Sequence, residues 1–136
     1  MSTITHEAGV QSLHDHVVNL VAQRWAKSAQ SKVTVNTGSE KKGRAGFDRN
    51  TPDLVGWKSS PKGTRVEWIA EVETKESLSR LEMRARWQDD AALGVPFYLF
   101  VPKGCRARAE QVAVKAGVTL NGIYEYAFVN ETLQLL

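Results

Sequence analysis

Residues 95–101, Val-Pro-Phe-Tyr-Leu-Phe-Val, constrain the fold of this chain more than any other stretch. The segment is nearly all apolar and directly follows Gly94, a residue that often ends a helix. A strand of this composition is typical of a sheet that is covered on both faces, and helices are the usual cover. We therefore predict an α/β fold with a central sheet flanked by helices.

Hydrophobic periodicity predicts the other elements and their order. Apolar residues recur at helical spacing over 6–28, and strands are expected at 31–37, 52–57 and 65–74, with a loop at 38–51. The turn residues at 59–63 make the second and third strands an antiparallel hairpin. Ser79 and Glu82 form a capping-box pair for a helix over 79–93. A helix at 106–116, ending at Gly117, and a strand at 120–129 complete a single domain of residues 1–136 with a mixed sheet.

Composition narrows the class of protein. Apolar residues make up 42 % of the 136 residues and charged residues 24 %, which is ordinary for a soluble domain. The longest apolar run is far below the roughly 20 residues that span a bilayer, and no signal-peptide pattern is seen. Cys105 is the single cysteine and forms no internal disulfide. We therefore expect a cytoplasmic protein without a membrane partner.

Basic residues form two clusters although the net charge is only +3. Such clusters suit a polyanion, while a solvated surface is the commoner explanation of any one of them. The first cluster lies in the predicted loop and the second at the start of the predicted helix 79–93. Their members are Lys41, Lys42, Arg44 and Arg49 in the first and Arg80, Arg84 and Arg86 in the second.

Carboxylates on the third predicted strand give the main chemical signal. Side chains alternate along a strand, so Glu71 and Glu73 share one face with Glu67, Ile69 and Lys75. Two neighbouring carboxylates on a half-buried strand repel each other and require a compensating cation, although a solvent-facing strand is the alternative.

A third carboxylate is expected to join this pair. Asp53 begins the partner strand, and the hairpin should bring it close to Glu71. Such oxygen ligands suit Mg²⁺ or Mn²⁺. The histidines do not suggest a metal: His14 and His16 point in different directions on their helix and are predicted to be surface or packing residues.

At this point the chain resembles a known family. The pattern is similar to the signature of the PD-(D/E)XK nuclease superfamily, nearest to its Holliday-junction resolvase-like and virus-type replication-repair branches. The αβββαβ restriction-endonuclease-like core of that superfamily has the element order predicted above, with a C-terminal helix and strand added here. The resemblance covers about residues 6–102. Its motif residues are Pro52-Asp53 and, after the hairpin turn, Ile69-Ala70-Glu71-Val72-Glu73-Thr74.

The resemblance implies a metal-dependent hydrolysis of phosphodiester bonds, with DNA as the expected nucleic acid. Asp53 and Glu71 would bind Mg²⁺ or Mn²⁺, Glu73 would add a ligand or orient the water, and Lys75 would reach the phosphate or the water. Glu7 would be a further carboxylate from the first helix. The residues implied to contact nucleic acid are Lys41, Lys42, Arg44, Arg49, Arg80, Arg84 and Gln88.

The motif departs from the family pattern and leaves alternatives open. Glu73 stands where lysine is usual if Glu71 takes the acidic position, whereas the register Glu73-Thr74-Lys75 restores a Glu-x-Lys unit. The apolar pair before Glu71 favours the first register. Two other functions compete with a nuclease: an inactive module of the same fold that binds DNA or a protein, and a subunit that forms a homodimer through its apolar tail, residues 123–136.

Overall fold

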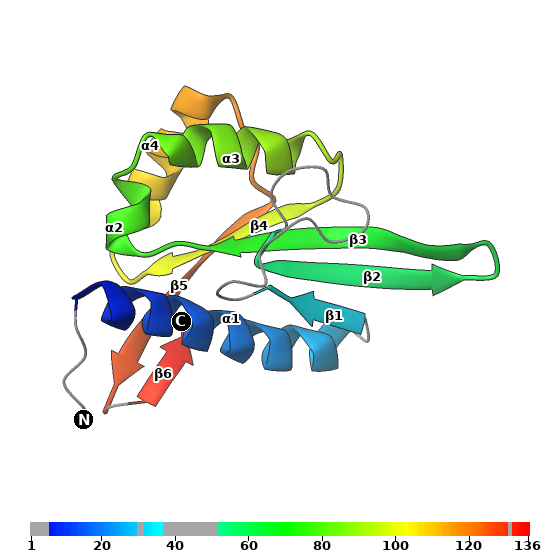
Figure 1. The fold of residues 1–136 in the computed structure, drawn as a ribbon, viewed down its shortest axis with the longest axis horizontal. Helices are drawn as coiled ribbons and strands as arrows, with labels where there is room; N and C mark the ends of the chain where they lie inside the picture. Colours follow the sequence, from blue (N-terminus) through cyan, green and yellow to red (C-terminus); the bar gives the residue numbers. More distant parts are fainter. Residues whose placement is uncertain (1–5, 30–31, 37–51, 131) are drawn as a thin grey trace.

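A six-stranded mixed sheet runs through the molecule, and helices cover both of its faces (Figure 1). The structure is a computed structural model that describes residues 6–29, 32–36, 52–130 and 132–136; in the first helix it describes the side chains of residues 13–26. The elements are α1 (His6–Ala29), β1 (Lys32–Val35), β2 (Leu54–Ser60), β3 (Gly63–Val72), α2 (Lys75–Leu78), α3 (Glu82–Ala91), β4 (Phe97–Pro102), α4 (Arg106–Ala116), β5 (Gly122–Val129) and β6 (Thr132–Leu135).

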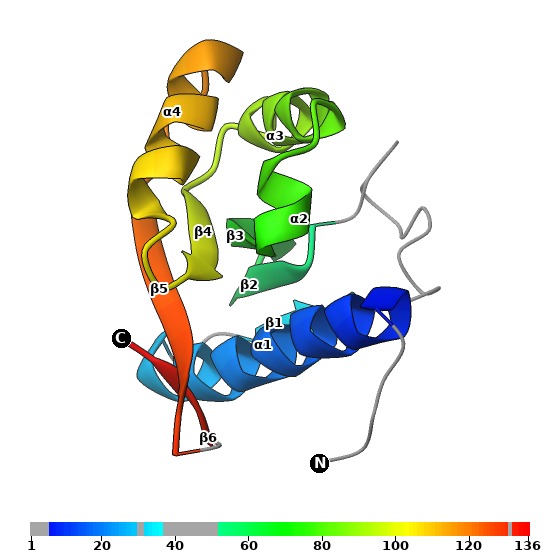
Figure 2. The ribbon, with the colours of Figure 1, turned by 90° about the vertical axis from the view of Figure 1, so that its left-hand side faces the viewer.

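The strands lie in the sheet in the order in which they occur in the chain. β1, β2 and β3 are antiparallel, β3, β4 and β5 are parallel, and β6 returns antiparallel to β5. The α/β class, the mixed sheet and the β2–β3 hairpin are confirmed. α1 lies on one face of the sheet, and α3 and α4 lie on the other (Figure 2).

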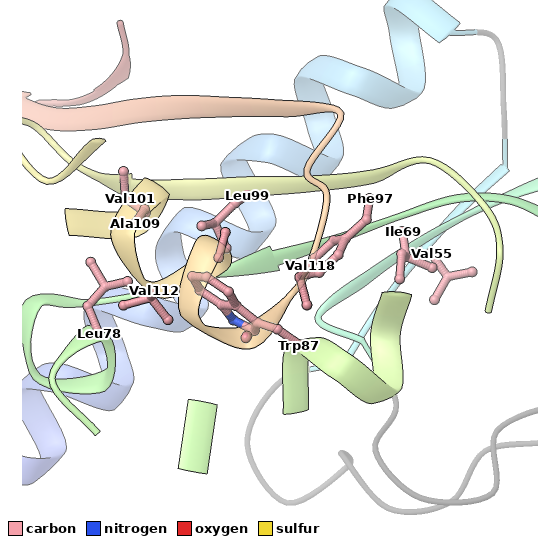
Figure 3. Packing of buried hydrophobic residues seen from close by; sticks show 12 residues of the cluster. Val55, Ile69, Leu78, Trp87, Phe97, Leu99, Val101, Ala109, Val112 and Val118 are labelled. Carbon is pink, nitrogen blue, oxygen red and sulfur yellow. The ribbon is translucent and has the colours of Figure 1, made fainter. Parts of the chain in front are cut away.

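Two apolar clusters join the helices to the sheet. One contains Trp87 of α3 and Val112 of α4, packed against Ile69 and Leu99 of the sheet (Figure 3). The other packs one stripe of α1 against the opposite face, where Phe100 lies. β4 therefore contributes side chains to both clusters and is buried on both faces, as its composition predicts. In the part of the chain that the structure describes, no helix is long and apolar enough to cross a membrane.

Alternation along β3 holds near its carboxyl end and is interrupted by a bulge farther back. Ile69 packs in the first cluster, while Trp68 and Ala70 pack in the second, as predicted. Gly56 of β2 is opposite Trp68, but the next residue, Trp57, is opposite Val66, which leaves Glu67 as the extra residue. The predicted alternation therefore breaks at Glu67.

The predicted helix 79–93 is wrong at its start. The reciprocal capping box is formed by Thr74 and Ser77 and begins α2, a helix of four residues. Ser79 is instead the C-cap of α2, and α3 begins at Glu82 without a side-chain cap. β3 ends at Val72, earlier than predicted. Thr74 and Ser77 therefore lie where the next helix begins, and they satisfy its free N–H groups upstream of Ser79.

α4 ends where predicted, whereas α3 ends at Ala91, before the predicted end at residue 93. Gly94 and Gly117 adopt left-handed backbone angles, with φ of 73° and 71°, and Gly117 ends α4 where predicted. Strand β6 was not predicted, because its few residues show little beyond a short alternation next to β5. The predicted loop 38–51 lies outside the described residues.

Candidate functional site

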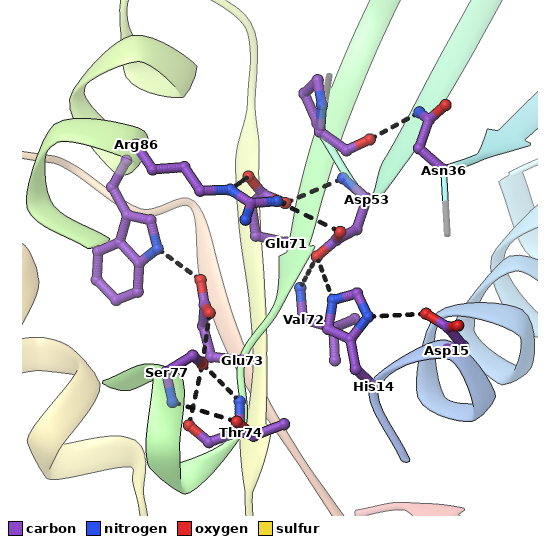
Figure 4. A network of polar contacts seen from close by, with 12 residues as sticks. His14, Asp15, Asn36, Asp53, Glu71, Val72, Glu73, Thr74, Ser77 and Arg86 are labelled. Atoms are coloured by element: carbon purple, nitrogen blue, oxygen red, sulfur yellow. Dashed lines mark hydrogen bonds and ion pairs between the residues drawn. The ribbon is translucent and has the colours of Figure 1, made fainter. Parts of the chain in front are cut away.

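Asp53 and Glu71 meet at the start of β2 and the end of β3, as predicted (Figure 4). The register pairs Leu54 with Ala70, so Asp53, just before Leu54, lies beside Glu71, just after Ala70. The backbone N–H of Asp53 donates to Oε1 of Glu71 at 3.0 Å, and the N–H of Val72 donates to Oδ2 of Asp53 at 2.8 Å. Asp53 is 1 % exposed and Glu71 is fully buried. The hairpin thus places two carboxylates in one buried polar site.

Arg86 of α3 supplies a positive charge to both acids. Its Nε lies 2.9 Å from Oε2 of Glu71, and its Nη2 lies 3.0 Å from Oε1 of Glu71 and 3.4 Å from Oδ1 of Asp53. Arg86 follows Met83 by three residues and precedes the fully buried Trp87 on the packed side of α3. The sequence predicts Mg²⁺ or Mn²⁺ as the cation beside the carboxylates and places Arg86 only in a basic cluster, so this contact was not predicted.

His14 of α1 also contacts Asp53. Its Nε2 lies 3.0 Å from Oδ2 of Asp53, and its Nδ1 lies 3.1 Å from Oδ1 of Asp15. The sequence interpretation treated His14 as a surface or packing residue and missed this contact. The signal was its position three residues before Val17 and four before Val18, since both valines are fully buried and residues at that spacing share a helix face.

Glu73 accepts hydrogen bonds that join β3 to the helical layer. Ser77 Oγ donates to its Oε1 at 2.7 Å, and Trp87 Nε1 donates to its Oε2 at 2.8 Å. The hydroxyl of Tyr126 on β5 donates to the backbone carbonyl of Glu73 at 2.8 Å. These contacts direct the Glu73 carboxylate toward α2 and α3, and they give it a clear structural role.

The remaining predicted site residues are dispersed or undescribed. Lys75 is exposed at the first position of α2 and does not lie on the strand, which corrects the predicted face. Gln88 donates from Nε2 to the carbonyl of Ala116 at 2.8 Å and so joins α3 to α4. Arg80 is exposed and Arg84 is half-buried. The residues whose side chains lie outside the described part are Glu7, Lys41, Lys42, Arg44 and Arg49.

The donor chemistry of the site fits a hard divalent cation. Asp53 and Glu71 present carboxylate oxygens, and the field that they create already attracts the guanidinium of Arg86. Among the described side chains, no group of three or more His, Cys, Asp or Glu residues is arranged to hold a metal ion. Of the side chains that the structure describes, these two carboxylates would hold a metal here, with water as a further ligand.

Comparison with known proteins finds no relative: no family model matches the chain, and no curated protein or solved structure shows significant similarity to it.

Proposed function

We propose that this protein is a metal-dependent nuclease of the PD-(D/E)XK type that hydrolyses phosphodiester bonds in nucleic acid, with DNA as the expected substrate. The observation that carries the proposal is the contact between Asp53 and Glu71, two buried acids from adjacent strands of one hairpin. The order helix, three strands, helical segment, strand, from α1 to β4, supports the same assignment. The motif is short, and its occurrence within this order of elements adds weight to the proposal.

In this function Asp53 and Glu71 would hold Mg²⁺ or Mn²⁺. The bound metal would supply Lewis-acid chemistry, which lowers the pKa of a water and stabilises charge on the phosphate. The chain orients both acids in advance: the N–H of Val72 and the imidazole of His14 fix Asp53, and the N–H of Asp53 fixes Glu71. Such orientation by outer contacts is typical of residues that bind metal ions.

The contacts favour Glu71 in the acidic position of the motif. Glu71 is the acid that meets Asp53, whereas Glu73 accepts hydrogen bonds from Trp87 and Ser77. The usual lysine position is therefore held by a residue with a structural role. Among the described side chains, Arg86 is the cation in contact with both acids, and we propose that it provides the positive charge at the reaction centre in place of that lysine.

A second function is favoured by the same arginine. A guanidinium in contact with both Asp53 and Glu71 gives the two acids a stabilising partner without metal. In that case the chain would be an inactive module of this fold that binds DNA, with Arg80 and Arg84 near the start of α3 as phosphate contacts.

Cleavage and binding assays on one set of substrates separate the two functions. Labelled single-stranded, duplex, flap and junction DNA, and matching RNA, would be incubated with Mg²⁺, Mn²⁺ or EDTA. Binding would be measured in EDTA at several salt concentrations. A nuclease cuts at least one substrate in the presence of metal and none in EDTA. Salt-sensitive binding without any cutting would instead establish the inactive module.

A further inference from the structure

We propose that Arg86 is a resident counter-ion that exchanges with the catalytic metal: it occupies Asp53 and Glu71 in the metal-free protein, and the metal displaces it. This inference rests on the proposed function, because it concerns the same two carboxylates. It adds a competition between a side chain and a metal ion, which the motif does not contain.

The contacts of Arg86 cover the oxygens that a bridging metal would need. Both oxygens of Glu71 accept from Arg86, at 2.9 Å and 3.0 Å, and Oδ1 of Asp53 lies 3.4 Å from the same guanidinium. The other Asp53 oxygen, Oδ2, is in contact with the N–H of Val72 and with His14. A metal bound by both acids must therefore take at least one oxygen that Arg86 holds.

Charge makes the two occupants exclusive. A guanidinium is always positively charged and donates only, so it repels a divalent cation on the same oxygens. Asp53 and Glu71 are almost completely buried, and buried carboxylates strongly require a positive partner. Either the arginine or the metal can serve as that partner, so the two compete for the same oxygens.

Arg86 is more exposed than the two acids, so its side chain can move out of the site. Its side chain is 21 % exposed, while the side chains of its partners are 1 % and 0 % exposed. The arginine therefore reaches the acids from the rim of the site. Once released, its guanidinium would remain at the rim of the site, where its two-donor edge suits a phosphate group.

Metal affinity and metal-free stability should consequently change in opposite directions when Arg86 is altered. Removing the competitor should tighten metal binding by about tenfold or more, within the usual range of coupling between two ligands. It should also lower the melting temperature of the metal-free protein and enlarge the rise in melting temperature that metal produces.

The test is a calorimetric titration of Mn²⁺ into purified wild-type, Arg86→Gln and Arg86→Lys proteins, with melting temperatures measured with and without Mn²⁺. Arg108→Gln, an exposed site on α4, is the matched control for loss of one arginine. We expect tighter Mn²⁺ binding for Arg86→Gln, an intermediate value for Arg86→Lys, and the wild-type value for Arg108→Gln.

The outcomes separate the inference from the proposed function. Mn²⁺ binding of the same or lower affinity in both Arg86 variants would overturn the exchange and leave the metal site standing. No Mn²⁺ binding to any protein would overturn both. If the variants fail to fold, NMR of the Arg86 Nε–H group in the wild type decides the matter. The chemical shift of that group should change when Mg²⁺ alone is titrated into the protein if Arg86 is displaced. An unchanged chemical shift at saturating Mg²⁺ would overturn the exchange.

Discussion

The backbone N–H of Asp53 donates a hydrogen bond of 3.0 Å to Oε1 of Glu71, so one acid is oriented by the backbone of the other. This contact depends on the register of β2 against β3, and therefore on the hairpin as a whole. His14 reaches the pair from α1 on one face of the sheet, and Arg86 reaches it from α3 on the other. The candidate site thus lies where all three layers of the fold meet.

Glu73 should matter more for stability than for chemistry. Glu73→Gln places an amide N–H₂ group against a hydrogen-bond donor, either Trp87 Nε1 or Ser77 Oγ, inside a buried region. We expect a loss of about 2 kcal/mol in the free energy of unfolding, the usual effect of an unsatisfied buried polar group. Urea denaturation measures it, with Glu82→Gln at the exposed start of α3 as the control.

A double-mutant cycle with Trp87→Phe tests the same contact. The two changes should couple by about 1 kcal/mol, since both remove one hydrogen bond. A Glu73→Gln protein of wild-type stability that has lost metal-dependent cleavage would instead give Glu73 the catalytic role predicted from the motif.

Gly56 allows β2 to pass beneath Trp68. A Cβ at this position would lie 2.1 Å from atoms of the Trp68 ring. That ring is buried and packs edge-on against the Trp25 ring, with 5.1 Å between the two ring centroids. Because the ring is confined, Gly56→Ala should lower the free energy of unfolding by about 3 kcal/mol, the upper part of the range for overpacking. Lys58→Ala, exposed on the same strand, should change stability by no more than about 0.5 kcal/mol. Equal stability of the two variants in urea would contradict the packing described.

The sequence predicted the elements whose signals are local and strong. The apolar run 95–101, the stripe of α1 and the glycine at 117 each depend on nearby residues, and each prediction agrees with the structure. The start of the helix after β3 was misplaced because two capping pairs, at Thr74 and Ser79, lie five residues apart. The sequence near each pair does not show which of the two begins the helix. The position at which β3 ends selects Thr74.

The site was predicted only in part for a similar reason. The hairpin brings Asp53 near Glu71, but counting back from Ser60 and Gly63 alone places Asp53 opposite Ala70. The bulge at Glu67 shifts the register by one residue, so that Leu54 pairs with Ala70 and Asp53 lies beside Glu71. Arg86 and His14 come from helices whose rotation about their own axes is fixed by packing across the sheet. The bulge at Glu67 also gives no local signal, because it depends on how Trp68 packs over Gly56.

Tyr126 should make the fold sensitive to alkali. Burial first, and then the charges of Cys105, Glu73 and Glu76, raise the pKa of the Tyr126 phenol well above its ordinary value of 10.0. Above about pH 10 the unfolded chain loses this proton while the folded chain keeps it, so the free energy of unfolding falls as pH rises.

Tyr126→Phe tests this contribution. The variant loses the hydrogen bond to Glu73, about 1 kcal/mol at neutral pH, but its stability should decline less steeply between about pH 10 and 11.5. Parallel slopes for the Tyr126→Phe and wild-type proteins in urea denaturation at each pH would contradict the assignment.

The most direct test of the proposed function is the rate of metal-dependent cleavage by proteins that differ in one carboxylate. Asp53→Asn and Glu71→Gln keep the size of each side chain, and Glu110→Gln, exposed on α4, is the matched control for loss of one acid. All would be purified in parallel and compared with wild type on the best substrate in Mg²⁺ and Mn²⁺. We expect a loss of at least about 100-fold for the first two and a wild-type rate for the control, because the metal site needs both acids. Cleavage by Asp53→Asn or Glu71→Gln at the control rate would contradict a metal site built on this pair.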